Sequence, residues 1–392
     1  MFAQRSNWKL TPNRLASTLE RLRANGTEVL DLTESNPTRC GLQHDADKIL
    51  SALADRRALE YCPEPKGLPS TREAIASYYR DRSGSRGAVE VNPENIIVTA
   101  STSEGYSFLL RLLCNPGDEV LVPAPSYPLF DYLAGLNDVK LAPYSLFYDH
   151  GWQIDLHSVE QALSPRSRAV IVVHPNNPTG SYVKPNEAEA LNRLCAQREL
   201  AIIADEVFLD FPHNDESRFS FAHNQSALTF TLSGLSKISA LPQMKVSWFV
   251  TSGPSSLVEP ALGRLEVIAD TFLTMNTPLQ LATPAMLEQR HRMRQQLQER
   301  IRTNLAKLDR QLARQKMTNR LDIEGGWYAV LRLPATRSDE DLAVELLQKK
   351  RVLVHPGHFY DFPAEGYLVV SLITPTEKFD EGIRRTTEFL SA

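Results

Sequence analysis

"RAVIVVHPNNPTG", residues 168–180, is a run of apolar, mostly β-branched residues that stops at a loop of prolines, asparagines and a glycine. A helical pattern follows in "EAEALNRLCAQR", residues 187–198, and a second apolar run in "LAIIADEVF", residues 200–208. The order strand, helix, strand is typical of parallel strands joined by a crossover helix. This stretch therefore predicts an α/β fold with a parallel sheet covered by helices on both faces.

The same alternation extends along the chain in both directions. Further helices are expected at 11–26, 71–82, 103–113 and 281–316, and further strands at 28–33, 95–101, 116–125, 230–237 and 245–252. In the first helix Thr11 is the expected N-cap. Beyond residue 316 the pattern is looser and predicts a smaller α+β lobe, against which the N-terminal helix packs. A chain of 392 residues is long enough for two such packed domains.

The bulk composition is that of a globular protein in a reducing compartment. Hydrophobic residues make up 42% of the chain, and the net charge of -4 gives no electrostatic reason to expect nucleic acid or a membrane surface as partner. Neither a secretory signal nor a membrane-spanning run is expected from the pattern. The four cysteines are scattered without metal-ligand spacing, which favours free thiols, a cytoplasmic protein and no metal site.

Polar clusters follow the predicted strands at their carboxyl ends, where ligands of parallel sheets collect. Ser101, Thr102 and Ser103 stand between a strand and a helix start, where free N–H groups and hydroxyls suit a phosphate. A capping box would explain the same residues. Tyr127, in "PAPSYPLF", lies in a rigid loop from which its ring can stack on a planar group or pack locally.

Three more residues extend this set. Asn177 lies in "HPNNPTG", a rigid turn that stops a buried strand. Asp205 ends the strand "AIIAD", and a carboxylate there needs a partner, which a protonated ring nitrogen, a salt bridge or a helix end would supply. Lys237 follows "TLSGLS"; a lysine near an anion site can be an amine nucleophile, although a lone lysine is more often a surface charge.

The order of Tyr127, Asn177, Asp205 and Lys237 along the chain resembles the class I/II aminotransferase family. The resemblance also includes "YCPEPKGLPSTREAIA", "CNPGDEVLVP", "GGWYAVLRLP" and "VLVHPGHFY", and so covers nearly the whole chain. It implies a fold-type I enzyme that uses pyridoxal 5'-phosphate (PLP). The implied large PLP-binding domain is 46–284, with a mostly parallel seven-stranded sheet between helices, and the small α+β domain is built from 1–45 and 285–392.

The resemblance also implies a role for each site residue. Lys237 would form the Schiff base with PLP and carry the proton at the substrate Cα. Asp205 would pair with the pyridinium nitrogen, Asn177 would donate to the 3'-oxygen, and Tyr127 would stack on the ring. The residues implied to bind the phosphate are Ser101, Thr102, Ser103, Ser236, Lys245 and, from the neighbouring subunit of a homodimer with a shared active site, Tyr61.

The sequence departs from the family pattern at four positions. Lys245 stands where arginine is usual, which keeps the charge and loses the planar fork. Phe208 stands where tyrosine is common, so a hydrogen bond to the 3'-oxygen is missing and a raised Schiff-base pKa is expected. Gly234 stands where a phosphate-binding serine is frequent, with Ser233 adjacent. Val369, in "GYLVVS", replaces the arginine that holds the substrate α-carboxylate, and Arg39 is one alternative cation.

Three hypotheses about function remain at this stage. The first is an aminotransferase that moves an amino group from an amino acid or amine to a 2-oxo acid through ping-pong half-reactions. The second is a PLP-dependent lyase on the same fold, for β-elimination at a C–S bond or decarboxylation. The third, a PLP-binding regulatory domain without turnover, is disfavoured because it would need a DNA-binding segment and the net charge is negative. Substrate and pathway do not follow from the sequence.

Overall fold

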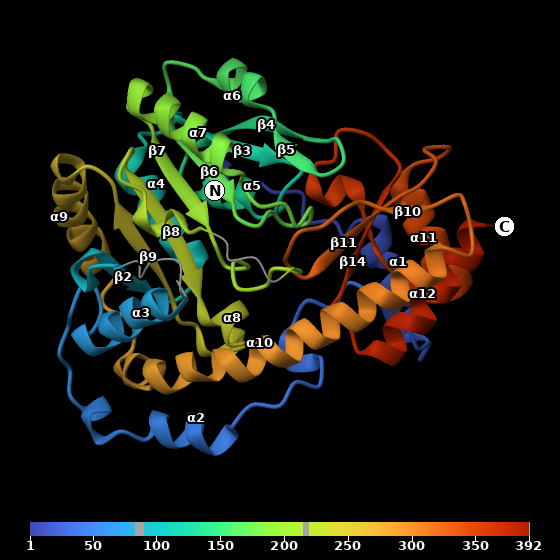
Figure 1. The fold of residues 1–392 in the computed structure, drawn as a ribbon, viewed down its shortest axis with the longest axis horizontal. Helices are drawn as coiled ribbons and strands as arrows, with labels where there is room; N and C mark the ends of the chain where they lie inside the picture. The colour runs from blue at the N-terminus through green and yellow to red at the C-terminus, as the bar shows by residue number, and fades with distance from the viewer. Residues whose placement is uncertain (83–89, 215–218, 392) are drawn as a thin grey trace.

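A large twisted sheet organises the left half of the molecule in Figure 1. The computed structural model describes residues 1–82, 90–214 and 219–391. Within these residues the sheet has eight strands in the order β2-β9-β8-β7-β6-β3-β4-β5. Their bounds, in sheet order, are Ile96–Thr99, Ser247–Ser252, Thr229–Gly234, Ala201–Asp205, Ser167–Val173, Glu119–Ala124, Lys140–Tyr148 and Trp152–Ile154.

The middle of this sheet is parallel, as the alternating pattern predicts, and it includes β4, a strand that the pattern does not indicate. Strands β8, β7, β6, β3 and β4 pair parallel, whereas β2 and β9 on one side and β5 on the other pair antiparallel. The expected seven-stranded sheet thus gains an eighth strand, because the short β5 turns back on the end of β4. A three-residue edge strand carries too little periodicity to be predicted.

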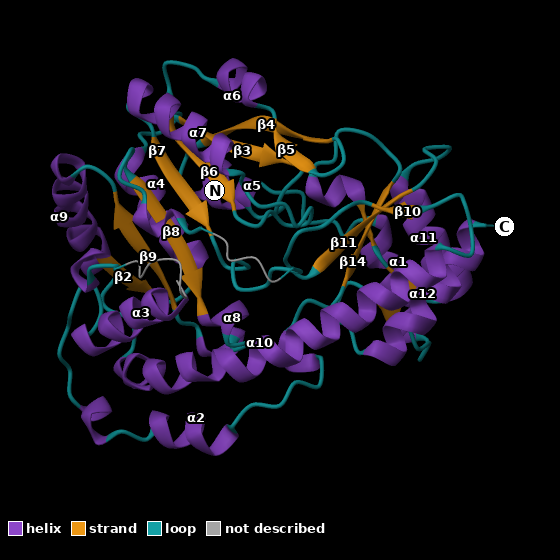
Figure 2. Ribbon diagram, viewed as in Figure 1, coloured by secondary structure: helices purple, strands orange, loops and turns teal. Residues whose placement is uncertain are grey.

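Helices cover both faces of the large sheet (Figure 2). On one face, residues of α4, α5 and α9 share a core with Ile203, Phe230 and Phe249 of the sheet. The other face is covered by α3, α8 and α10 near β9 and by α6 and α7 near β6. The bounds of these helices, in chain order from α3 to α10, are Pro69–Arg82, Thr102–Leu113, Phe130–Leu136, Leu156–Ala162, Pro185–Arg198, Leu235–Ile238, Ser255–Thr271 and Thr277–Leu312.

A second, four-stranded sheet lies at the right of Figure 1, with segments from both ends of the chain beside it. Its order is β10-β11-β14-β13, all antiparallel, and the first strand β1 pairs parallel with β12 next to it. The strands are β1 (Leu30–Asp31), β10 (Asn319–Arg320), β11 (Tyr328–Arg332), β12 (Val352–Leu353), β13 (His355–Pro356) and β14 (Tyr367–Ser371). The helices are α1 (Arg14–Ala24), α11 (Asp339–Lys350) and α12 (Thr376–Leu390), and α2 (Ala46–Leu53) packs on α10.

The long helix α10 belongs to both halves. It packs on α3 and α8 near the large sheet and on α12 beside the small sheet. The proposed boundary between the two domains, at residues 284 and 285, falls inside this helix. The two proposed domains are therefore connected by one continuous helix. No helix in the described ranges is both long and apolar enough to cross a membrane.

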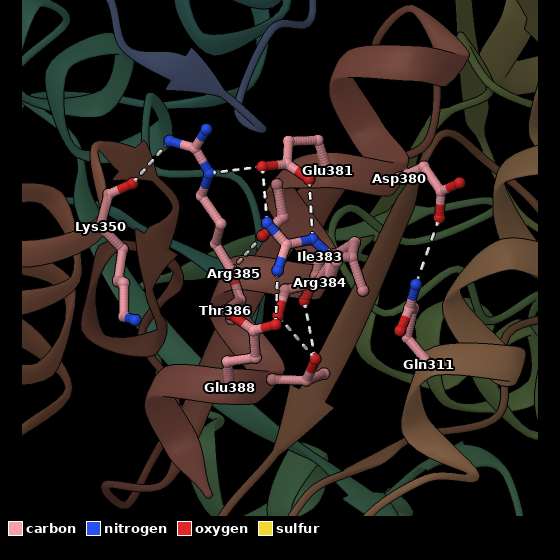
Figure 3. Close-up of polar contacts among 11 residues, drawn as sticks. Gln311, Lys350, Asp380, Glu381, Ile383, Arg384, Arg385, Thr386 and Glu388 are labelled. Carbon is pink, nitrogen blue, oxygen red and sulfur yellow. Dashed lines mark hydrogen bonds and ion pairs between the residues drawn. The ribbon is translucent and has the colours of Figure 1, made fainter. Parts of the chain in front are cut away.

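Local contacts set the ends of the terminal helices. The expected cap Thr11 of α1 is wrong: Asn13 is the N-cap, and its Oδ1 accepts from the Ala16 N–H at 2.8 Å. Pro12 lies ahead of the cap rather than in the first turn. On α12, Glu381 accepts from Arg384 and Arg385 at 2.8 and 2.7 Å, and Arg385 also donates to the Lys350 carbonyl at 3.1 Å (Figure 3). This network fastens α12 to the end of α11.

Candidate active site

Three strands of the large sheet end at one edge with a polar residue or loop. Asp205 is the last residue of β7, level with Val173 of β6 and Leu232 of β8. The loop with Asn177 begins after Val173, and α8 with Lys237 begins directly after β8. Parallel register therefore places the asparagine loop, the carboxylate and the lysine helix side by side.

The Asp205 carboxylate is buried, with 8% of the residue exposed. Its Oδ2 accepts from the Tyr106 hydroxyl at 3.1 Å and its Oδ1 from the Val207 N–H at 3.2 Å. Burial raises its pKa to about 6, against the opposing effect of these bonds and of the Lys237 charge. Among the described residues Asp205 has no ion-pair partner within 4 Å, so neutral donors make its direct contacts and the Lys237 charge acts only from a distance.

Lys237 lies in an aromatic surrounding. Its Nζ is 5.4 Å from the ring centroid of Phe208 and 5.1 Å from that of Trp327. Burial lowers its pKa to about 8, while the Asp205 charge acts in the opposite direction. At pH 7 roughly a tenth of this amine is therefore unprotonated, far more than for an ordinary lysine, as a nucleophile or base requires.

Asn177 and Tyr127 flank the carboxylate. Asn177 is 7% exposed, and within the described chain its buried Oδ1 has no hydrogen-bond partner. Its neighbour Asn176 holds the loop by donating to the Pro125 carbonyl at 3.3 Å. Tyr127 stands edge-on to Phe130, and burial followed by the Asp205 charge raises its pKa. Tyr127 is 37% exposed, so part of the residue remains accessible to a ligand.

At the start of α4, Ser101 acts as the N-cap, as the capping-box alternative predicts. Its Oγ accepts from the Glu104 N–H at 3.1 Å, and Glu104 Oε2 accepts from the Ala100 N–H at 2.7 Å. Thr102 and Ser103, the first two residues of the helix, are partly exposed. The helix start thus has its N-cap in place, and its partly exposed first turn begins at the same sheet edge, directly after the end of β2.

The other residues expected to bind the phosphate are more varied in exposure and position than those at the start of α4. Ser236 is partly exposed next to Lys237, and Lys245, at φ 52°, is exposed at the end of a short 3-10 turn, Pro242–Met244. Tyr61 is 76% exposed and does not reach the other site residues of its own chain in any described contact. The structure therefore brings Asp205, Lys237 and Tyr127 together and leaves Tyr61 apart.

Val369, which stands where the resemblance implies an arginine, lies inside the small sheet. Val369 is 1% exposed, in register with Val330 on one neighbouring strand and His355 on the other. Burial lowers the His355 pKa to about 4, so this imidazole is neutral. The side chain of Arg39 is exposed. No cation on β14 takes the place of the expected arginine in the described structure.

Two contributors to the site were not singled out from the sequence. Tyr106 donates to Asp205 from the second turn of α4, and Trp327, from "GGWYAV", lines the Lys237 side chain. For Tyr106 the available signal is its position three residues after Ser103, on a helix that starts at this sheet edge. Trp327 is brought in by long-range packing that no local pattern reveals.

Comparisons with known proteins agree with this architecture. The model of the family "Aminotransferase class I and II" matches residues 27–385. The glutamate-pyruvate aminotransferase of Escherichia coli strain K12 is 26% identical over 386 residues, covering 95% of this chain and 93% of that protein. The aspartate/prephenate aminotransferase of Thermus thermophilus is 28% identical over 389 residues, covering 94% and 93%.

Solved structures are similar over the full length. A crystal structure of an aminotransferase from Escherichia coli has a TM-score of 0.86 at 25% identity and covers 100% of this chain and 98% of that one. An alanine aminotransferase from Pyrococcus furiosus has a TM-score of 0.88 at 22% identity and covers 100% and 99%.

Proposed function

The chain belongs to the aminotransferase class I and II family, and on that premise we propose which residues serve the PLP-dependent amino transfer and which substrates they accept. The relatives named above are all aminotransferases, and no observation favours β-elimination or decarboxylation. The observation that carries the proposal is a pair of groups at neighbouring strand ends. One is a buried carboxylate that accepts from Tyr106 and the Val207 N–H, and the other is a lysine whose Nζ lies beside the rings of Phe208 and Trp327.

The residues present fit PLP. A buried carboxylate without an ion-pair partner in the described chain suits a protonated ring nitrogen, and the Asn177 amide, 7% exposed in the loop after β6, has an NH2 group that can donate to a ring oxygen. When bound, PLP supplies the electron-withdrawing ring for chemistry at the substrate Cα. We assign Asp205 to the ring nitrogen, Asn177 to the ring oxygen and Tyr127 to the ring face. The phosphate falls to Thr102, Ser103, Ser236 and Lys245, with Ser101 ordering the helix start.

Lys237 is the residue that moves protons. Its Nζ would hold the cofactor in the resting enzyme and, once released, take the proton from the substrate Cα and return one in the reverse half-reaction. Phe208 and Trp327 keep water away from this amine, which sustains its lowered pKa. Tyr106 holds Asp205 in place as a positioning residue.

For substrates we propose an amino acid as donor and a 2-oxo acid as acceptor, with L-glutamate and pyruvate as the first pair to test. This choice rests on the names of the relatives. Val369 removes the usual arginine, so carboxylate recognition falls to neutral donors near the site or to Arg39. The buried Tyr328 hydroxyl, which lies close enough to Tyr127 for the two groups to affect each other's charge, is one such donor.

We further propose a cytoplasmic homodimer. Tyr61 is 76% exposed and nearby Leu59 is 89% exposed, as expected of residues that a second copy covers. All four cysteines are free thiols, which agrees with a reducing compartment.

The direct test is a product assay. PLP-loaded protein with L-glutamate and pyruvate is expected to yield equal amounts of L-alanine and 2-oxoglutarate, whereas Lys237→Ala yields neither. The exposed Lys349→Ala serves as the matched control and retains activity. Ammonia and pyruvate released from a single amino acid, with no transfer product, would instead establish elimination. A panel including primary amines without a carboxylate determines whether Val369 has changed the substrate class.

A further inference from the structure

At Gly234, the last residue of β8, a neighbouring side chain leaves no room for a residue larger than glycine. Its φ of 177° is ordinary extended backbone, so the position does not need glycine for its conformation. A Cβ built on Gly234 would lie 2.9 Å from the Cβ of Ser247 and closer still to the Ser247 Oγ. The Ser247 side chain therefore occupies the space into which a side chain at position 234 would project.

Strand register shows which way this hydroxyl points. Ser247 begins β9 and pairs with Thr99 of β2 on one side and with Gly234 on the other. Residues level with one another on paired strands point to the same face of a sheet, and so do residues two positions apart on one strand. A Cβ on Gly105 of α4 would lie 3.4 Å from Phe249, two residues along from Ser247. The Ser247 hydroxyl thus lies on the face that α4 covers.

It also lies at the level where α4 begins. Thr99 is the last residue of β2, its hydroxyl donates to the Ser101 carbonyl at 3.0 Å, and Thr102 starts the helix. Gly234, on the other side, is followed directly by α8 with Lys237. The Ser247 hydroxyl is thereby placed between the first turn of α4 and the lysine helix.

The Ser247 hydroxyl makes no hydrogen bond in the described chain. Ser247 is 4% exposed, and across residues 1–82, 90–214 and 219–391 its Oγ has no donor or acceptor partner. The Oγ itself is not fully enclosed, so a bound acceptor can reach it and take its hydrogen bond. The neighbouring Ser233 does not substitute for it, because Ser233 is level with Trp248, whose Nε1 donates to Tyr79 of α3 on the opposite face.

We propose that Ser247 donates a hydrogen bond to the phosphate of the cofactor and so replaces the hydroxyl that Gly234 lacks. The hydroxyl comes from Ser247 on β9, and Gly234 on β8, which has no side chain, leaves the room that the Ser247 side chain occupies. The inference rests on PLP as cofactor and concerns only its phosphate group. It is independent of which amino acid the enzyme accepts.

The test compares two ligands that differ only in the phosphate. Apoprotein is titrated with PLP and, separately, with pyridoxal, following the visible absorbance. Ser247→Ala is expected to weaken PLP binding on the order of ten-fold to a hundred-fold, because a hydrogen bond to a charged group is lost, and to leave pyridoxal affinity within about two-fold. Ser233→Ala, which removes the hydroxyl on the opposite face, is expected to change neither.

Exchanging the residues at positions 234 and 247 tests whether a serine on either strand can bind the phosphate. Ser247→Gly is expected to bind PLP as weakly as Ser247→Ala, and Gly234→Ser combined with Ser247→Gly to recover most of the PLP affinity. Equal weakening of PLP and pyridoxal in Ser247→Ala, no weakening at all, or a double variant no tighter than Ser247→Gly would each overturn the proposal. Failure of amino transfer by the wild-type protein would instead count against the proposed function, because these titrations need no turnover.

Discussion

At the scale of single residues, Asp205 is the group whose ionisation matters most to the apoprotein. Burial raises its folded-state pKa from the ordinary 3.8 to about 6. Protonation of Asp205 therefore stabilises the fold at low pH, and this stabilisation is lost as the pH rises through about 6. Asp205→Asn removes the charge at every pH, so the variant apoprotein is expected to be more stable than wild type at pH 8, by about 3 kcal/mol in denaturant unfolding.

Measuring the unfolding of wild type and Asp205→Asn at low pH provides a control for this prediction. Near pH 4 the wild-type carboxyl is largely protonated, and the two apoproteins are expected to unfold with nearly equal free energies. Asp205→Asn should at the same time bind PLP more weakly, because the amide offers no charge to a protonated ring nitrogen. A variant less stable than wild type at pH 8 would mean that the carboxylate contributes to stability rather than to the cofactor.

Phe208 leads to a second prediction at this scale. Its ring packs edge-on against Trp327 and Tyr328, with centroids 5.2 and 6.1 Å apart, and lies beside the Lys237 amine. Phe208→Tyr supplies a hydroxyl that can donate to the ring oxygen of PLP, which favours the deprotonated form of the link to Lys237. The pH midpoint of the visible absorbance change in the holoprotein is expected to fall by on the order of one unit. Phe208→Leu, without a hydroxyl, is the control and should not lower it.

How far the sequence predicts this site depends on whether a residue's role is local. Asn177, Asp205 and Lys237 each end or follow an apolar run, so strand-end position alone singles them out. Ser247 does not stand out, because its position opposite Gly234 depends on the register of two antiparallel strands. The register between β8 and β9 depends on how the whole strands pack, so no short motif around Ser247 predicts it.

At the scale of elements, helix α3 is fastened to the segment that follows β7. Arg82 pairs with Asp210 at 2.6 Å, and the Tyr78 hydroxyl donates to the same carboxylate at 3.0 Å. Only 9% of the Asp210 side chain is exposed. Arg82→Met would leave this charge buried with one neutral donor, and a loss of about 3 kcal/mol or more in unfolding free energy is expected.

A second arginine beside the same ring provides the matched control. Arg290 of α10 lies 5.8 Å from the Tyr78 centroid, as does Arg82, but its partner Asp81 is 59% exposed. Arg290→Met leaves a carboxylate that water can solvate, so a loss below about 1 kcal/mol is expected. Equal losses in the two variants would show that packing on Tyr78, and not the buried charge, determines the effect.

At the scale of the whole molecule, the sequence predicts the large sheet better than its surroundings. The parallel strands β3, β6, β7 and β8 contain apolar runs separated by helices, so local pattern and global fold agree there. The parallel strand β4, with the sequence KLAPYSLFY, has no β-branched residue and is not expected from the pattern. The small sheet is made of strands as short as Leu30–Asp31 and Asn319–Arg320, which pair with partners far away in the sequence. Their pairing follows from how α10 and α12 bring the chain together, and two residues carry no periodicity of their own.

The proposed dimer makes a prediction that concerns two copies of the chain at once. If Tyr61 completes the site of the partner subunit, then Lys237→Ala and Tyr61→Ala damage different sites in a mixed dimer, and one of its two sites is intact. Random exchange makes half of the dimers mixed, so the mixture should regain roughly a quarter of wild-type activity at PLP levels that leave Tyr61→Ala inactive. The control mixes Lys237→Ala with Asp205→Ala; both residues serve the site of their own chain, so no activity should return. If Tyr61 acts within its own subunit, the first mixture will remain as inactive as the second.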